Sequence, residues 1–223
     1  MAGRRGPYAK SAARRDAILD AAEEVFSTTA YHCSSVTDIA RRAGLTTAMV
    51  WYYFPSKGDL FAAVLKRRDD LAFRLSPRDP DDPLHELQGF VDFAVQTLPF
   101  PGVIAPQGIT TSRPAPQDDA ARVYCVERYA LMRQRLTEIL DRCHARGLLC
   151  PGIEPTRSAR AIVAMMDGLQ IQSLTDPDSV DVVDDLDNYL AALFVPGAWG
   201  YEAARELGAM KGRGAAGLDP ASP

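Results

Sequence analysis

The stretch from Thr46 to Lys57 places hydroxyl, apolar, aromatic and cationic side chains close together in the sequence. The hydroxyls of Thr46 and Thr47 can hydrogen-bond with several bases, and Met49 can pack against a thymine methyl group. Three aromatic residues follow directly: Trp51, Tyr52 and Tyr53. Lys57, together with two arginines just upstream, offers positive charge to phosphates. This combination of residue types indicates a surface that binds a polyanion.

Other chemistries find little support in the sequence. The three histidines, His32, His85 and His144, lie in separate segments. Two of them are adjacent to a cysteine, but neither pair has the ligand spacing of a zinc site. There is no glycine-rich phosphate loop and no nucleophile elbow. We therefore expect no metal, no cofactor and no enzymatic activity. Besides polyanion binding, three other functions stay open for the chain. They are a regulator that senses redox state through a cysteine, a small all-α enzyme, and a helical adaptor that does not bind DNA.

The elements that must position the Thr46–Lys57 stretch are two short helices. Ser35 is expected to cap the first of them, with Asp38 three residues later as a variant of the capping box. Gly44 ends this helix, and Thr46 or Thr47 caps a helix that reaches Tyr53. Six residues can then be buried: Val36, Ile39, Ala40, Leu45, Val50 and Phe54. Two short helices joined by a tight turn are typical of a helix-turn-helix, in which the second helix enters the major groove. A plain helical hairpin with core aromatics is the alternative.

The rest of the chain is also predicted to be helical. Apolar residues recur with helical spacing in these stretches: 13–29, 57–75, 84–98, 118–146, 154–174 and 178–195. A short helix near 103–111 would bring the total to about nine. No run of alternating β-branched residues occurs, so the predicted fold class is all-α. The N-terminal part forms a three-helix helix-turn-helix domain, and the C-terminal part forms a helical-bundle regulatory domain.

Composition agrees with a soluble globular protein of 223 residues, of which 47% are hydrophobic and 24% charged. The net charge of −4 is uneven, because residues 1–74 carry 12 basic and 8 acidic residues and the remainder carries 13 and 21. A basic N-terminal segment on an acidic body suggests that only that end meets a polyanion. The N-terminus lacks a signal-peptide pattern. The uncharged run 93–112 contains three prolines and two glycines, so it is not expected to span a membrane. Four cysteines without a secretory signal favour a reducing cytoplasm.

The stretch from Arg15 to Val64 resembles the DNA-binding domain of the tetracycline-repressor (TetR) family of bacterial transcription regulators. The similarity lies in the pattern Ile-Leu-x-Ala-Ala-x-x-x-Phe of the first helix and in Asp-Ile-Ala-x-x-Ala-Gly of the second. It continues in an aromatic-rich third helix and in Phe-Pro-Ser-Lys followed by Asp-Leu. The resemblance implies four segments: a basic arm (1–13), a DNA-binding domain with its linking fourth helix (14–75), a ligand-binding and dimerisation domain (76–197) and a flexible tail (198–223).

The resemblance also implies which residues contact operator DNA. Ser35, Thr37 and Lys57 resemble phosphate contacts. Base edges would be read by Thr46, Thr47, Ala48 and Met49, with Trp51, Tyr52 and Tyr53 beside them. Two departures matter: Ala30 replaces a usual glycine, and Trp51 stands where a tyrosine is usual and so lacks its hydroxyl. Because the recognition helix has no Arg, Asn or Gln for bidentate base contacts, specificity is expected to depend on DNA shape and on Arg4 and Arg5 reaching a minor groove.

The C-terminal half is expected, by the same resemblance, to bind a small-molecule effector and to form a homodimer. Candidate effector-binding residues are Phe93, Gln96, Phe100, Tyr124, Arg128, Met132, Met166 and Gln170. Candidate dimer-interface residues are Ile162, Met166, Leu169, Val183, Leu186 and Leu190. Packing within one subunit explains both sets as well, and solvent exposure is the simpler expectation for Arg128. The implied function is a repressor that binds a palindromic operator as a dimer and is released when an effector moves the fourth helix.

Overall fold

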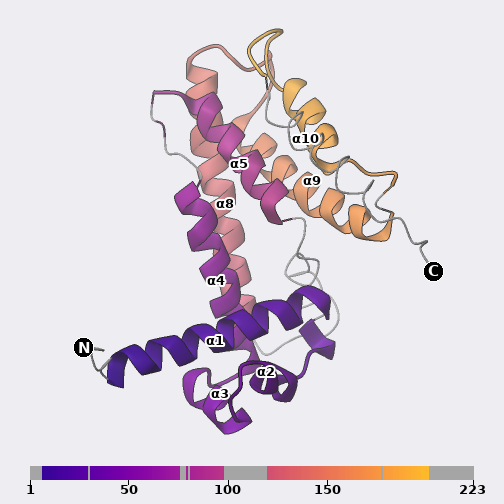
Figure 1. The fold of residues 1–223 in the computed structure, drawn as a ribbon. Coiled ribbons are helices and arrows are strands. Elements are labelled where there is room, and N and C mark those ends of the chain that lie inside the picture. The colour runs from indigo at the N-terminus through magenta and orange to yellow at the C-terminus, as the bar shows by residue number, and fades with distance from the viewer. Residues whose placement is uncertain are drawn as a thin grey trace, which may run out of the picture. The chain divides into compact units, whose positions relative to one another are not determined.

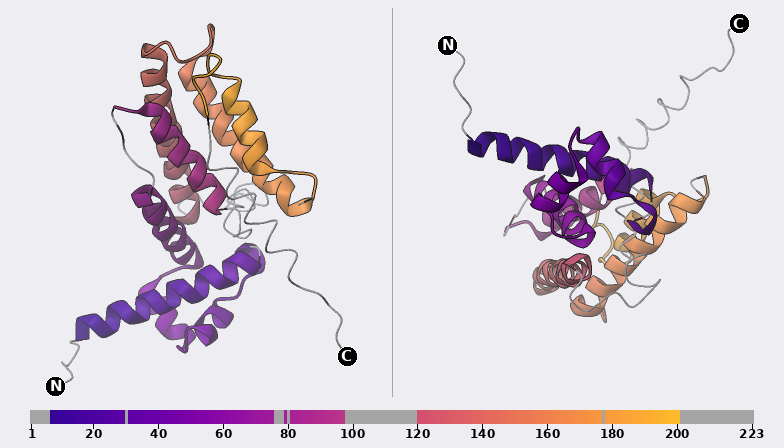
Figure 2. Two further views of the ribbon diagram at one scale, coloured as in Figure 1. Left: turned by 45° about the horizontal axis from the view of Figure 1, so that its top comes forward. Right: turned by 90° about the horizontal axis from the view of Figure 1, so that it is seen from below.

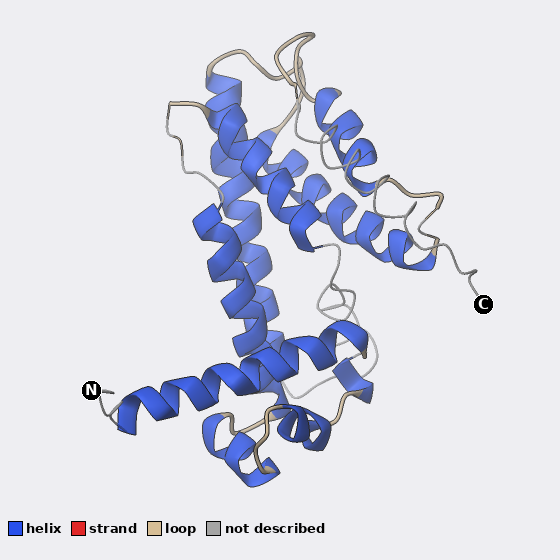
Figure 3. Cartoon of the chain, in the orientation of Figure 1, coloured by secondary structure: helices blue, strands red, loops and turns tan. Residues whose placement is uncertain are grey.

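The computed structural model describes residues 7–29, 31–75, 79, 81–97, 120–176 and 178–200. These residues form eight α-helices and one 3₁₀ helix, with a single isolated β-bridge in place of any sheet (Figures 1 and 3). The prediction of an all-α fold is therefore confirmed. By its contacts the chain divides into two compact units: Met1–Pro77 with Gln96–Gln134, and Arg78–Val95 with Arg135–Pro223.

The first unit is built around the helix α1, Pro7–Thr28, which packs against α2, Val36–Arg42, and α4, Lys57–Leu75. The 3₁₀ helix η1, Tyr31–Cys33, joins α1 to α2, and the short helix α3, Thr47–Tyr53, packs against α2. The short helices α2 and α3 lie along one side of α1 in the different views of Figures 1 and 2.

A single apolar cluster holds these helices together. Its fully buried members include Ile18 and Phe26 of α1, Ile39 of α2 and Phe61 of α4. The rings of Phe26 and Phe61 meet edge to face with centroids 5.1 Å apart, a favourable arrangement for aromatic pairs. Ala121 and Cys125 of the long helix α8, Ala120–Ala145, belong to the same cluster. The start of α8 therefore completes the first unit.

The second unit contains α5, Pro83–Thr97, the remainder of α8, α9, Pro155–Thr175, and α10, Val182–Ala191. Its buried residues include Leu87, Leu136, Ile139, Ile162 and Leu186. The turn between α8 and α9 is fastened to the end of α10 by two backbone hydrogen bonds of 2.9 Å each, on either side of the isolated bridge. These contacts close the bundle at that end.

Several predicted boundaries differ from the structure. The helix α1 starts at Pro7 and not near Ala13, so residues 7–13 are not part of an arm. Proline fits the first helical position because its φ is already helical and its missing N–H would be unpaired there. The last helix starts at Val182 and not at Asp178, because Asp181 caps it by accepting hydrogen bonds from two backbone N–H groups, and it ends at Ala191 and not at Val195.

At the other end of the chain, the predicted flexible tail starts too early. Trp199 stacks on Phe194 with ring centroids 5.3 Å apart, and its Nε1 donates a 2.7 Å hydrogen bond to Asp187. The carbonyl of Gly200 accepts from Gln88 at 2.6 Å. Residues 198–200 are therefore anchored to the second unit. The predicted short helix near 103–111 lies outside the described residues.

Candidate DNA-binding site

The turn between α2 and α3 is defined by a glycine and a threonine. Gly44 has a φ of 67°, a left-handed conformation that favours glycine. The N–H of Leu45 then donates to the carbonyl of Ala40 at 2.9 Å, which satisfies the end of α2. The Oγ1 of Thr46 accepts from the N–H of Met49 at 3.3 Å and caps α3. Gly44 and Thr46 thus do what the sequence predicts.

The start of α2 differs in detail. Ser35 occupies the N-cap position with extended backbone angles, but its side chain makes no capping hydrogen bond. Asp38 does not complete a capping box, because its carboxylate binds Arg41 and Arg42 instead. The hydrogen bonds to these two arginines lower the pKa of Asp38 below its ordinary value. Ser35 therefore has an exposed hydroxyl that the helix does not use.

One face of α3 is buried and the other faces solvent, as the sequence predicts. Val50 is fully buried and Phe54, just beyond the helix, is nearly so, while Leu45 is half-buried. On the outer face the exposed fraction is 41% for Trp51 and 78% for Tyr52. Large aromatic side chains at such exposure mark an interaction surface. The alternative of a helical hairpin with core aromatics is therefore wrong for these two residues.

Tyr53 contributes to packing as well as to this surface. It is half-buried against the apolar cluster, and its hydroxyl lies 3.1 Å from the hydroxyl of Ser11 in α1. Its ring meets that of Tyr52 edge to face, with centroids 5.2 Å apart. The remaining predicted DNA contacts are exposed or half-buried. Exposed are Ser35, Thr37, Thr46 and Ala48; half-buried are Thr47 and Met49.

The cations expected to face phosphates are partly engaged inside the chain. Arg42 forms ion pairs with Asp38 and with Glu24 of α1. Lys57 donates a 2.8 Å hydrogen bond to the carbonyl of Ser34, and its Nζ lies 4.6 Å from the ring centroid of Tyr31. Burial lowers the pKa of Lys57 from its ordinary value. Lys57 therefore fixes η1 to the start of α4, a role that its spacing alone does not reveal.

Two of the predicted effector-binding residues form a polar clamp that joins α4 to α8 within the first unit. The carboxylate of Asp69, with only 8% of its side chain exposed, accepts hydrogen bonds from Tyr124 Oη at 2.6 Å and from Arg128 Nε at 2.8 Å. Arg128 is itself only 15% exposed, so the expectation that it faces solvent is wrong. Asp69 is not among the residues predicted from the sequence, although an acidic residue on the inner side of a helix is a recognisable signal.

The clamp shifts the titration of its members. Burial and the neighbouring Asp69 carboxylate raise the pKa of Tyr124 far above its ordinary value, so its hydroxyl stays protonated and donates. Burial disfavours the charge on Arg128, but the Asp69 carboxylate outweighs this and raises its pKa. Arg128 therefore remains a cation at every physiological pH, and Asp69 supplies its counter-charge.

The other predicted effector-binding residues are dispersed. Met132 is buried in the first unit, whereas Met166 and Gln170 are buried one turn apart on α9 in the second. Phe93 and Gln96 belong to α5, and nothing is described of their side chains. Phe100 lies outside the described residues, as do Arg4 and Arg5.

Most predicted dimer-interface residues are buried within the single chain. Relative exposure is 3% or less for Ile162, Met166, Leu186 and Leu190, whereas Leu169 and Val183 are half-buried. A side chain that is already buried inside one chain has little surface left for a second. These four therefore serve the core of the second unit, which is the alternative that the sequence left open.

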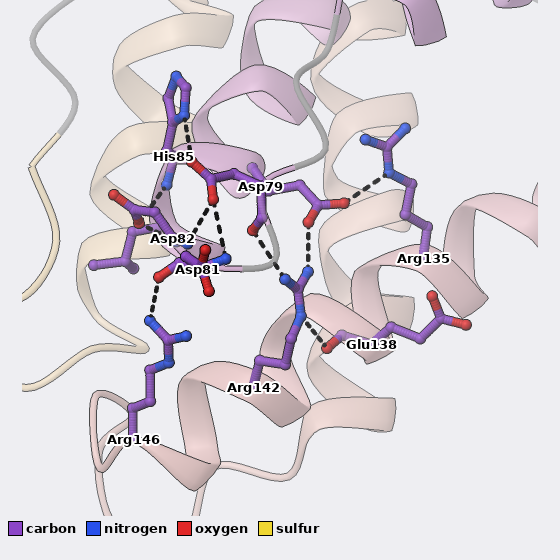
Figure 4. Close-up of polar contacts among 10 residues, drawn as sticks. Asp79, Asp81, Asp82, His85, Arg135, Glu138, Arg142 and Arg146 are labelled. Carbon is purple, nitrogen blue, oxygen red and sulfur yellow. Dashed lines mark hydrogen bonds and ion pairs between the residues drawn. The ribbon is translucent and has the colours of Figure 1, made fainter.

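A second polar cluster lies inside the second unit (Figure 4). Glu86 of α5 has 7% of its side chain exposed and accepts hydrogen bonds from Arg135 at 3.3 Å and Arg142 at 2.5 Å, both on α8. Arg142 also donates to the backbone carbonyl of Asp79 at 3.0 Å, and Arg146 donates to the same segment at 2.6 Å. The arginines therefore fasten the start of α5 to α8, and Glu86 neutralises part of their charge.

Within the described ranges, no group of three or more His, Cys, Asp or Glu side chains could hold a metal ion. Among those same residues, no helix has the length and apolar character needed to cross a membrane.

The short helices α2 and α3, their glycine turn and the exposed face of α3 define a helix-turn-helix DNA-binding protein. Comparison with known proteins agrees with this class. Residues 18–64 match the model for "Bacterial regulatory proteins, tetR family", and residues 113–195 match the model for "BetI-type transcriptional repressor, C-terminal". The chain therefore belongs to the TetR family of bacterial transcription regulators.

Individual relatives extend over most of the chain. The HTH-type transcriptional regulator AcrR of Shigella flexneri is 26% identical over 191 residues, covering 80% of this chain and 86% of AcrR. The regulator TtgR of Pseudomonas putida is also 26% identical, covering 79% and 87%. The crystal structure of NalD, the secondary repressor of a multidrug efflux pump in Pseudomonas aeruginosa, superposes with a TM-score of 0.62 at 28% identity, covering 86% of this chain and all of NalD.

Proposed function

We propose that this protein is a cytoplasmic repressor, without catalytic activity, that binds a palindromic operator as a homodimer and is released by a small-molecule effector. The observation that carries the proposal is the outer face of α3, where Trp51 and Tyr52 stand exposed on a helix that is capped and anchored by buried neighbours. Membership of a family of transcription regulators supports it.

Dimerisation follows from the small size of the reading surface. The helix α3 has seven residues, so one chain can contact only a few base edges. Two chains related by a two-fold axis would read two half-sites about 34–36 Å apart, or a multiple of that distance. A palindromic operator is the expected consequence. The half-buried Leu169 and Val183 remain the predicted dimer contacts that a second chain could cover further.

The effector is proposed to act on the equilibrium between a DNA-binding and a non-binding arrangement of the dimer. It needs to favour the second by a few kcal/mol. Met166 and Gln170 are the first positions to substitute in search of its site, because they are buried one turn apart on the same helix. NalD represses a multidrug efflux pump, so a screen can begin with substrates of such pumps.

A footprint on DNA that flanks the protein's own gene tests the proposal. We expect protection of a two-fold symmetric site, and we expect deletion of the gene to raise transcription from that site. The variant Tyr52→Ala should fold normally and lose affinity for the site, since 78% of Tyr52 is exposed. The variant Val126→Ala is the matched control, because Val126 is a 56% exposed apolar residue of α8 in the same unit. Failure of the purified dimer to bind any duplex would refute the proposal.

A further inference from the structure

The cations of the first unit differ in how far they are neutralised inside the chain. Five arginines form ion pairs with carboxylates of the same unit: Arg41, Arg42, Arg67, Arg68 and Arg128. The ammonium group of Lys57 is occupied by the carbonyl of Ser34 and the ring of Tyr31. A cation whose charge is already balanced by a carboxylate, or whose ammonium group is held by a carbonyl, gains less from binding a phosphate.

Lys10 and Arg14 are different. Both side chains are exposed, they lie one turn apart on α1, and neither makes an ion pair or hydrogen bond with any residue that the structure describes. At 100° per residue they are about 40° apart around the helix, so their charges point the same way. The nearest acidic residue of the helix, Asp16, lies about 160° around from Arg14 and does not neutralise this face.

The first turns of α1 are held beside the end of the reading helix α3. The hydroxyls of Ser11 and Tyr53 lie 3.1 Å apart. One turn further along α1, the guanidinium of Arg15 stacks over the ring of Phe54, 5.1 Å from its centroid. Ser11 and Arg15 alternate with Lys10 and Arg14 in the sequence, so the contacts that anchor the helix also fix where its two free cations lie. Figure 2 shows α1 running past α3 toward its N-terminus.

We propose that Lys10 and Arg14 bind the DNA phosphates that border the groove occupied by α3. A helix in the major groove directs its first turn at the bases. The C-terminal end of α3, together with the first turns of α1 that contact it, then faces the phosphate backbone. Because Lys10 and Arg14 lie on a helix that is already formed, they lose less conformational entropy on binding phosphates than residues of a flexible basic arm would. This inference rests on the proposed function.

The test is the salt dependence of DNA binding. Wild type, Lys10→Gln/Arg14→Gln, Lys10→Arg/Arg14→Lys and Lys66→Gln are each titrated with a labelled 40-base-pair duplex of arbitrary sequence between 50 and 200 mM salt. The same series is repeated with a duplex that wild type selects from a random pool. Lys66 is an exposed lysine of α4 and serves as the control for loss of one charge. Thermal unfolding of every variant checks that the fold is unchanged.

Removing both cations should make the slope of log K against log[salt] shallower by about 1.8 per chain, because each phosphate contact contributes about 0.9. Affinity in 0.1 M salt should fall by at least roughly tenfold on both duplexes, since phosphate contacts carry no sequence information. The charge-conserving variant and Lys66→Gln should stay within about twofold of wild type. An unchanged slope in Lys10→Gln/Arg14→Gln, or an equal loss in Lys66→Gln, would overturn the inference. Absence of binding by wild type would instead refute the proposed function.

Discussion

The clamp formed by Asp69, Tyr124 and Arg128 should be a major source of stability in the first unit. Replacing Asp69 by Ala removes the 2.6 Å hydrogen bond from Tyr124 and the bifurcated one from Arg128 Nε, at 2.8 and 3.1 Å to the two carboxylate oxygens. It also takes the counter-charge from Arg128. Breaking one partner of a buried pair typically costs about 3–5 kcal/mol. Because 15% of Arg128 remains exposed, we expect a loss near the lower end, about 3 kcal/mol in the free energy of unfolding.

The two tryptophans allow this loss to be measured in the correct unit. Trp51 belongs to the first unit and Trp199 to the second. In a Trp199→Phe background, the fluorescence of Trp51 reports urea unfolding of the first unit alone. With a slope of about 1–3 kcal/mol per molar urea, a loss of about 3 kcal/mol shifts the midpoint by about 1 M or more.

A matched control and a double variant make the result decisive. Asp20 pairs with Arg67 but is 72% exposed, so Asp20→Asn should cost less than about 1 kcal/mol. The double variant Asp69→Leu/Arg128→Met should be more stable than Asp69→Ala, because it leaves no uncompensated charge. If Asp69→Ala costs no more than Asp20→Asn, the reasoning about buried charge is refuted for this site.

Three further predictions concern a helix cap, a thiol and pH. Thr46→Ala should lower the free energy of unfolding by about 1 kcal/mol in urea titrations, whereas Thr46→Ser keeps the cap and the stability. Burial raises the pKa of the Cys143 thiol to about 11, so mass spectrometry after alkylation at pH 8 should find Cys33, which is exposed, modified well before Cys143. Hydrogen bonds from backbone N–H groups, first that of Arg157, lower the pKa of Glu154 below its ordinary 4.5; its stabilising contribution is therefore present above pH 4.5 and lost below. The melting temperature of Glu154→Gln should lie below that of wild type at pH 7, and the two should converge as the pH falls through the lowered pKa of Glu154.

Local signals in the sequence predicted the helix-turn-helix well. The start of α4 at Lys57 matches the prediction, because Ser56 caps it and Pro55 disfavours an earlier start. The turn at Gly44 and the cap at Thr46 were likewise specified by neighbouring residues. Such features depend on contacts within a few positions, which spacing and residue type reveal.

Predictions that required knowledge of distant partners were less successful. Arg128 and Tyr124 have the polar character of ligand-binding residues, but their partner Asp69 lies on another helix more than 50 positions away in the sequence. In the same way, Ile162 and Leu186 fit a dimer interface and a core equally well until their burial within one chain is known. A periodic pattern identifies the inner face of a helix but not what it packs against.

The pairing of charges also changes what the basic N-terminal segment means. In the sequence, its excess of 4 positive charges is spread over the whole helix-turn-helix, yet in the fold Arg41 and Arg42 of α2 and Arg67 and Arg68 of α4 have carboxylate partners. Exposed ion pairs are worth about 1 kcal/mol or less, so a phosphate could displace Asp38 from Arg41 at small cost. Lys57 is half-buried and its ammonium group already binds a carbonyl and an aromatic ring, so it has least to gain from a phosphate. The cations should therefore contribute to DNA affinity in the order of their freedom, with Lys10 and Arg14 first, Arg41 next and Lys57 last.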